Sequence, residues 1–192
     1  IESGRYSEAI RILEAGAAAD RTAGNPDRAA AKQVAIAYAE LSRGRNAAAV
    51  AAAGRAIGES ETMKVRFLAG RIYALTGETE AARSIAAALS NELPAEPRAH
   101  AKVLEADLAL SAGDPRRAIS LLGEANGLLD TWIGRFDLGR AYLEAGALIE
   151  ADSEFDRCVK RKGEALSLFL DEEPTYGYFP AVYYYQGRVR EG

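Results

Sequence analysis

The stretch DLGRAYLEAGALIEADSEFDRC, residues 137–158, decides the fold. Within it, Gly146 separates two segments that have the apolar spacing of amphipathic helices. Three other stretches align on a glycine in the same place, and their anchor glycines are Gly44, Gly77 and Gly113. The four anchors are spaced by 33, 36 and 33 residues, which indicates an internal repeat. One more partial copy begins at Gly4.

Alanine is unusually abundant, with 40 residues in a chain of 192. It is the strongest helix former and the smallest side chain that still favours a helix. An alanine lies five residues after each anchor glycine, and a second small or apolar residue follows seven positions later. The first set is Ala49, Ala82, Ala118 and Ala151, and the second is Ala56, Leu89, Ala125 and Cys158. We expect these residues where helix axes approach to about 8–10 Å.

The repeat predicts an all-α chain. The expected helix pairs are 26–43 with 46–58, 61–76 with 79–91, 95–112 with 115–126, and 131–145 with 148–162. A single helix over 5–19 precedes them, and another from Pro180 to about Arg190 follows. Each anchor glycine should adopt the left-handed conformation that ends a helix. Asn25, Asn46 and Asp114 should act as N-caps, with Pro26 and Pro115 at the first helical position.

The quoted stretch resembles a tetratricopeptide repeat. Leu138-Gly139 and Tyr142 match the first helix of that family, and Ala151, Phe155 and a small residue match the second. Arg135 stands where the family has an early Trp, and Ala106 and Ala109 replace the Gly and Tyr of the third copy. The resemblance implies a right-handed α-solenoid of antiparallel helix pairs, forming one domain over 1–192. Its parts are 1–20, 26–58, 59–94, 95–127, 131–163, an irregular connection at 164–179, and 180–192.

The resemblance also implies a concave groove lined by the first helix of each pair. By the helical period we place these residues in it: Tyr38, Lys64, Phe67, Arg71, Asp107, Phe136, Arg140, Leu143, Tyr184 and Arg188. The aromatic residues would supply contact area, and the arginines would hold an acidic side chain or a carboxylate. The alternative is that these arginines are ordinary surface residues neutralised by Glu105, Asp107 or Glu144. The Lys/Asn carboxylate clamp of some relatives is not supported, since no groove asparagine accompanies Lys64.

The scarcity of Cys and His limits the chemistry. One Cys excludes an internal disulfide and any paired-cysteine zinc site, and one His disfavours histidine-dependent catalysis. We therefore expect a non-enzymatic protein without catalytic residues, metal or cofactor, and treat an enzyme acting through Glu144 and Asp107 as a remote alternative. His100 is expected to be an ordinary surface residue, and Cys158 a buried apolar one.

The expected partner is a protein or peptide, with acidic peptides as one option. A net charge of −4 argues against nucleic acid, and no apolar run approaches the ~20 residues of a membrane span. Residues 176–185 hold six of the fifteen aromatic residues. We expect them to pack the last helix on the preceding repeat; a base-stacking platform is the alternative, but interleaved basic residues are missing.

A second, weaker resemblance involves Asp171–Thr175 and Tyr183–Arg188. These residues are similar to C-terminal repeat regions of bacterial eukaryotic-type serine/threonine kinases, which implies a regulatory domain of a signalling protein as the alternative function. Residue 1 is Ile and the sole methionine is Met63, so we expect part of a longer protein. The first and last helices would each lack a pair partner, which predicts head-to-tail self-association. The compartment stays open, with a slight preference for the cytoplasm.

Overall fold

The computed structural model describes residues 4–165 and 178–191. Every regular element in these two ranges is an α-helix, which confirms the all-α prediction. The chain divides into two compact units, residues 1–85 and 86–192, and each unit is described by itself.

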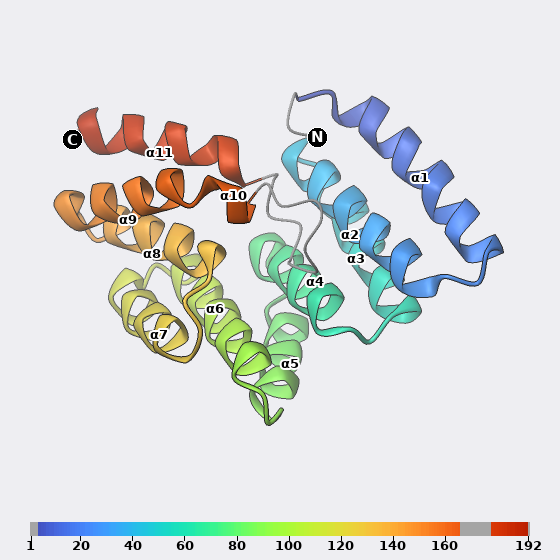
Figure 1. Ribbon diagram of the computed structural model, residues 1–192, viewed down its shortest axis with the longest axis horizontal. Helices are drawn as coiled ribbons and strands as arrows, with labels where there is room; N and C mark the ends of the chain where they lie inside the picture. Colours follow the sequence, from blue (N-terminus) through green and yellow to red (C-terminus); the bar gives the residue numbers. More distant parts are fainter. Residues whose placement is uncertain (1–3, 166–177, 192) are drawn as a thin grey trace. The chain divides into compact units, whose positions relative to one another are not determined.

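In the first unit, successive helices pack against one another (Figure 1). They are α1 (Tyr6–Thr22), α2 (Pro26–Ser42), α3 (Asn46–Glu59) and α4 (Met63–Thr76); α5 (Thr79–Ser90) contains the boundary between the units. Helix α2 also touches α4, so alternate helices are neighbours as well.

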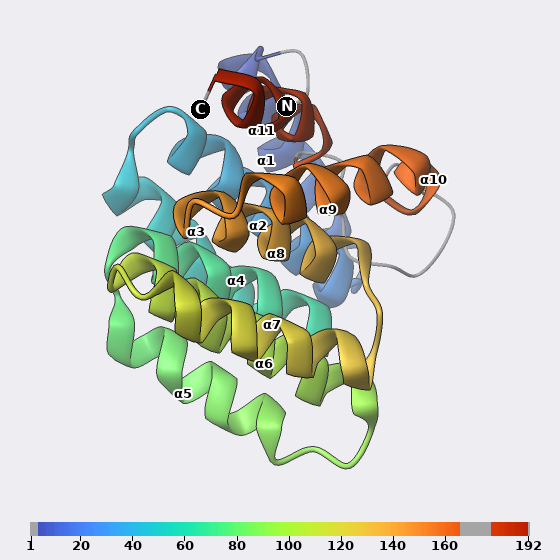
Figure 2. The ribbon, with the colours of Figure 1, turned by 90° about the vertical axis from the view of Figure 1, so that its left-hand side faces the viewer.

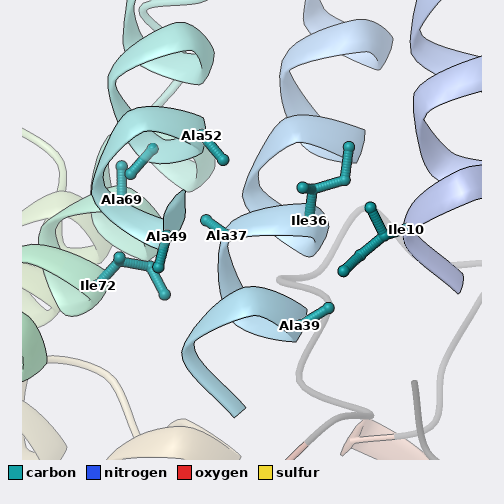
Figure 3. Close-up of a cluster of buried hydrophobic side chains, with 9 residues drawn as sticks. Ile10, Ile36, Ala37, Ala39, Ala49, Ala52, Ala69 and Ile72 are labelled. Carbon is teal, nitrogen blue, oxygen red and sulfur yellow. The ribbon is translucent and has the colours of Figure 1, made fainter. Parts of the chain in front are cut away.

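Alanine forms much of the core of this unit. Figure 3 shows Ile10 of α1 facing Ile36 of α2, with alanines of α2 and α3 on the other side. The four positions of α3 that face its neighbours are fully buried alanines: Ala49, Ala52, Ala53 and Ala56. Because alanine adds so little bulk, the helices pack closely, as the repeat predicts.

The second unit repeats this arrangement. It contains α6 (Ala95–Ser111), α7 (Pro115–Leu128), α8 (Trp132–Glu144), α9 (Leu148–Lys160), α10 (Lys162–Ala165) and α11 (Phe179–Glu191). Figure 2 shows α7 beside α6 and α8. Helix α8 contacts α9, and α11 packs on both α8 and α9. Alternate helices again touch, since α6 contacts α8.

The anchor glycines end helices as predicted. Gly44, Gly77, Gly113 and Gly146 all have positive φ, between 71° and 86°, and Gly4 shares the conformation. Gly24, which the repeat alignment did not single out, has φ of 73° and follows the end of α1. It explains why α1 reaches Thr22 instead of ending at residue 19. The other described boundaries lie within about two residues of the predicted ones.

The predicted N-caps are only partly correct. The Asp114 carboxylate accepts a hydrogen bond from the Arg117 backbone N–H at 3.0 Å, as expected. Asn25 occupies the N-cap position of α2, but its side chain makes no capping bond. The prediction for Asn46 is wrong, because it is the first residue of α3 and Arg45 precedes it at the cap. A cap that was not predicted occurs at α8, where the Thr131 hydroxyl accepts a hydrogen bond from the Gly134 backbone N–H at 3.1 Å.

Candidate partner-binding surface

An aromatic cluster fixes α11 to α8 and α9. Phe136 stacks on Trp132 with ring centres 5.5 Å apart and meets the edge of Tyr185 at 5.7 Å. Tyr185 in turn stacks on Phe155 at 5.6 Å, and Phe179 lies 6.3 Å from Trp132. These contacts confirm that aromatic residues of the 176–185 segment pack the last helix on the preceding pair.

Two tyrosines of the same segment lie at the margin of the cluster, and the Tyr183 ring meets that of Phe179 edge-on at 5.5 Å. Tyr183 is 55% exposed and Tyr184 is 61% exposed, so both present aromatic surface to solvent. The Tyr184 ring lies 5.3 Å from that of Tyr185, which places it at the margin of the cluster. Tyr176 and the acidic stretch 171–174 lie outside the described residues.

Arg140 lies between two buried carboxylates. Its Nη1 is 2.9 Å from Asp137 Oδ1 on α8 and 3.8 Å from Asp107 Oδ1 on α6. The guanidinium carbon also lies 6.0 Å from the ring centre of Tyr185. Burying a carboxylate is costly unless a cation accompanies it, and Arg140 lies beside both of these. Only 16% of the Arg140 side chain is exposed.

This geometry bears on the two interpretations of Arg140. The alternative in which Asp107 neutralises a groove arginine describes Arg140 well, although the side chain is mostly buried instead of solvated. Most of its charge is engaged within the protein. An acidic ligand would therefore meet only the exposed edge of this guanidinium.

The predicted groove residues differ widely in exposure. Phe67, Arg71, Asp107 and Phe136 are buried, and the Arg71 guanidinium lies 5.8 Å from the Phe67 ring centre. Tyr38, Lys64 and Leu143 are half-buried, whereas Tyr184 and Arg188 are exposed. The buried residues offer little surface to a partner. The groove as a whole stays a prediction.

Within the second unit, the members of the predicted set that keep some exposed surface come from two contacting helices, and Arg140 keeps only 16% of its side chain exposed. Arg140 and Leu143 lie one turn apart on α8, and Tyr184 and Arg188 lie one turn apart on α11. We call these four residues the α8–α11 surface. It combines an exposed aromatic ring, an aliphatic side chain and an exposed guanidinium, a set suited to a peptide that carries an acidic residue.

The predictions for His100 and Cys158 fare differently against the structure. The expectation that His100 lies at the surface is wrong: it is buried, with Nδ1 2.8 Å from the Glu96 carbonyl oxygen. It lies between the buried Ala99 and Ala101 of α6, and its polar side chain carried no sign of burial in the sequence. Cys158 is fully buried, as expected, and burial raises its thiol pKa to about 12. The Trp132 indole N–H donates to the Cys158 carbonyl at 3.0 Å.

Sequence reasoning missed an ion-pair network beside this region. Arg135 donates to both oxygens of Asp130, at 2.8 and 2.9 Å, and Arg161 donates to Asp130 at 2.8 Å. Hydrogen bonds from Arg135 lower the pKa of Asp130 to about 2, with Arg161 adding to the effect. Arg161 also holds Glu164 at 2.7 Å. The network connects the segment before α8 to α10. Its signal in the sequence was two arginines, each with an acidic residue within five positions: Arg135 after Asp130, and Arg161 before Glu164.

No model of a known protein family matches the chain, and no curated protein matches it. In the described ranges, no group of three or more His, Cys, Asp and Glu side chains is arranged to hold a metal ion. Among the helices of those same ranges, none combines the length and the apolar character that a membrane crossing requires.

Proposed function

We propose that this chain is a tetratricopeptide-type, right-handed α-solenoid of antiparallel helix pairs that acts as a non-enzymatic interaction module. The observation that carries the proposal is the recurrence of one unit: a helix, a left-handed glycine, and a second helix with buried small residues at fixed offsets. Stacked units of this kind build extended surfaces that bind proteins and peptides.

Contacts between α8 and α9 support the antiparallel pairing. Trp132, the first residue of α8, bonds to Cys158 near the end of α9. Farther along α8, Arg135 Nη1 lies 3.3 Å from Glu154. Gly139 is so close to Phe155 that an added Cβ would fall 2.7 Å from the ring. Helices that run in opposite directions produce such a pattern.

The α8–α11 surface is the proposed binding site. Tyr184 supplies a large, rigid contact area, and aromatic residues of this kind dominate many protein interfaces. Arg188 lies one turn away and can bind a carboxylate through two N–H donors. Leu143 adds apolar area. The expected ligand is a short peptide in which an acidic residue neighbours an apolar one.

A matched pair of arginine variants tests the proposal. Acidic peptides with a fluorescent label are titrated with the 192-residue chain, and binding is followed by polarisation. Arg188→Ala should weaken binding about three- to fivefold at low salt, since an exposed charge pair contributes up to about 1 kcal/mol. Tyr184→Ala should weaken it by about tenfold or more. The loss in Arg188→Ala should shrink at high salt.

Arg190→Ala is the control, because Arg190 is also exposed and lies in the same last turn of α11. It should bind like the unmodified chain. Failure of every acidic peptide to bind, or equal binding by Arg188→Ala and Arg190→Ala, would contradict the proposed site.

The weaker resemblance to kinase-associated repeat regions adds no second candidate. It spans residues 171–188, and residues 171–177 lie outside the described ranges. The carboxylate pair of the remote enzymatic alternative gains no support either, because the buried Asp107 lies beside Arg140.

A further inference from the structure

A cavity of about 370 Å³ lies at the connection between α3 and α4, within the first unit. We call it the α3–α4 cavity. Its lining comes from the end of α3, the connection itself and the first turn of α4, and consists of Ile57, Ser60, Glu61 and Arg66. Small-molecule sites in proteins typically measure ~300–1,000 Å³. The α3–α4 cavity is at the lower end of that range, which suits a small ligand.

The fold itself fixes the inner wall of this cavity. Ser60 is only 5% exposed, and its hydroxyl donates a hydrogen bond to Asp27 Oδ1 at 2.6 Å. The same oxygen accepts a hydrogen bond from the Thr62 backbone N–H at 3.2 Å. Because Asp27 lies in the first turn of α2, these bonds tie the connection to a third helix. The position of Ser60 is therefore set before any ligand arrives.

The lining carries one charge of each sign. Arg66 is half-buried and its Nε has no contact with solvent, which holds part of the guanidinium in place. Glu61 is exposed, and among the described residues its carboxylate forms no hydrogen bond or ion pair. A bound molecule can therefore reach the Glu61 carboxylate without breaking an internal contact.

These groups suit a molecule that carries both charges and an apolar part. A guanidinium binds a carboxylate through two parallel N–H donors. Arg66 also lies in the first turn of α4, where the helix dipole favours a negative group. Glu61 would bind an ammonium group, whereas it would repel a simple anion. Ile57 supplies an apolar wall against which an aliphatic side chain can pack.

We propose that the α3–α4 cavity binds a free α-amino acid with an aliphatic side chain. The carboxylate of the amino acid binds Arg66, its ammonium group binds Glu61, and its side chain packs on Ile57. The cavity lies in the first unit, whereas the α8–α11 surface lies in the second. This inference therefore goes beyond the proposed function and does not depend on peptide binding.

A titration of the 192-residue chain with L-leucine, followed by heteronuclear NMR, tests the proposal. The backbone amide signals of residues 57–66 should shift most, with a Kd on the order of 1 mM for so small a ligand. Two analogues each remove one charge: N-acetyl-L-leucine lacks the ammonium group, and L-leucinamide lacks the carboxylate. Each analogue should bind about fivefold more weakly than L-leucine, since each loses one charge pair.

Two variants assign the charges to their partners. Glu61→Gln keeps the size of an exposed side chain, so the chain should fold normally. It should weaken L-leucine binding about fivefold and leave N-acetyl-L-leucine binding unchanged. Arg66→Lys keeps the charge but loses the paired donors, so it should weaken both of these ligands and leave L-leucinamide unchanged. Glu14→Gln is the matched control, because Glu14 is an exposed glutamate on α1, which does not line the cavity.

The proposal fails if L-leucine does not bind at concentrations well above the expected Kd. It also fails if N-acetyl-L-leucine binds the unmodified chain as tightly as L-leucine does, or if Glu61→Gln and Glu14→Gln bind L-leucine equally well. Tyr184→Ala, which alters the peptide site, should leave L-leucine binding unchanged. Loss of L-leucine binding with intact peptide binding would overturn only this inference, and the reverse result only the proposed site.

Discussion

Replacing Gly139 with alanine tests how closely α8 and α9 approach. A Cβ at this position would lie 2.7, 2.9 and 3.0 Å from three ring carbons of Phe155. Normal carbon–carbon contact is about 3.5–4.0 Å, so the ring would have to move by about 0.8 Å or more. Phe155 is fully buried and its ring contacts those of Tyr185 and Phe136.

The expected magnitude combines two opposing effects. Overpacking a tight core costs about 1–3 kcal/mol. Alanine inside a helix is favoured over glycine by about 1 kcal/mol. We therefore expect Gly139→Ala to lower the free energy of unfolding by about 1 kcal/mol. Gly123→Ala in α7 is the control, since a Cβ there meets nothing within 4 Å. It should raise the free energy of unfolding by up to about 1 kcal/mol.

The assay follows the unit that contains both glycines. Trp132 is the sole tryptophan of the sequence and stacks on Phe136, so its fluorescence reports unfolding of the second unit. For a chain of this size each kcal/mol moves Tm by about 2–4 °C. Gly139→Ala and Gly123→Ala should shift Tm in opposite directions. Adding Phe155→Leu to Gly139→Ala should recover part of the loss. A stabilised Gly139→Ala variant would refute the close contact.

Two further predictions concern ionisable groups. The folded pKa of Asp130 is about 2, below the ordinary 3.8, so the unfolded state takes up the proton first. The contribution of Asp130 to the free energy of unfolding is complete above about pH 4 and is lost as the pH falls toward 2. Because the Asp130 side chain is nearly half exposed, solvent screens part of this contribution. Asp130→Asn should therefore lower the free energy of unfolding, measured with urea, by about 1 kcal/mol at pH 7 and by almost nothing at pH 2. Because burial raises the pKa of Cys158 to about 12, a thiol reagent at pH 8 should react with it only when the chain unfolds. Rapid labelling of the folded chain would contradict this.

The helices were predictable because their signals are local. Glycines such as Gly113 and Gly146 end helices through a conformation that depends on the residue itself, and Pro26 and Pro115 fix a first helical turn. Side-chain capping was harder to predict. Asn46 and Thr131 both have side chains that can cap a helix, yet only Thr131 occupies an N-cap position. In each helix, the path of the preceding loop determines which residue falls at the cap.

The candidate surface was less predictable than the helices. Helical periodicity places Phe136 and Tyr184 in equivalent positions, yet one is buried and the other is 61% exposed. The difference arises because α9 and α11 cover α8 with aromatic side chains, while the equivalent side of α11 is open. The period gives the direction of a side chain but does not say whether another helix lies over it.

The sequence by itself determined the helical class, the places where helices end, and the positions that must stay small. These properties follow from propensities and spacings within one or two helical turns. Only the tertiary structure decided that His100 is buried, that Arg140 lies between Asp137 and Asp107, and that Tyr183 is exposed. Burial and ion pairing depend on residues distant in the chain, and the repeat pattern does not specify which of them meet.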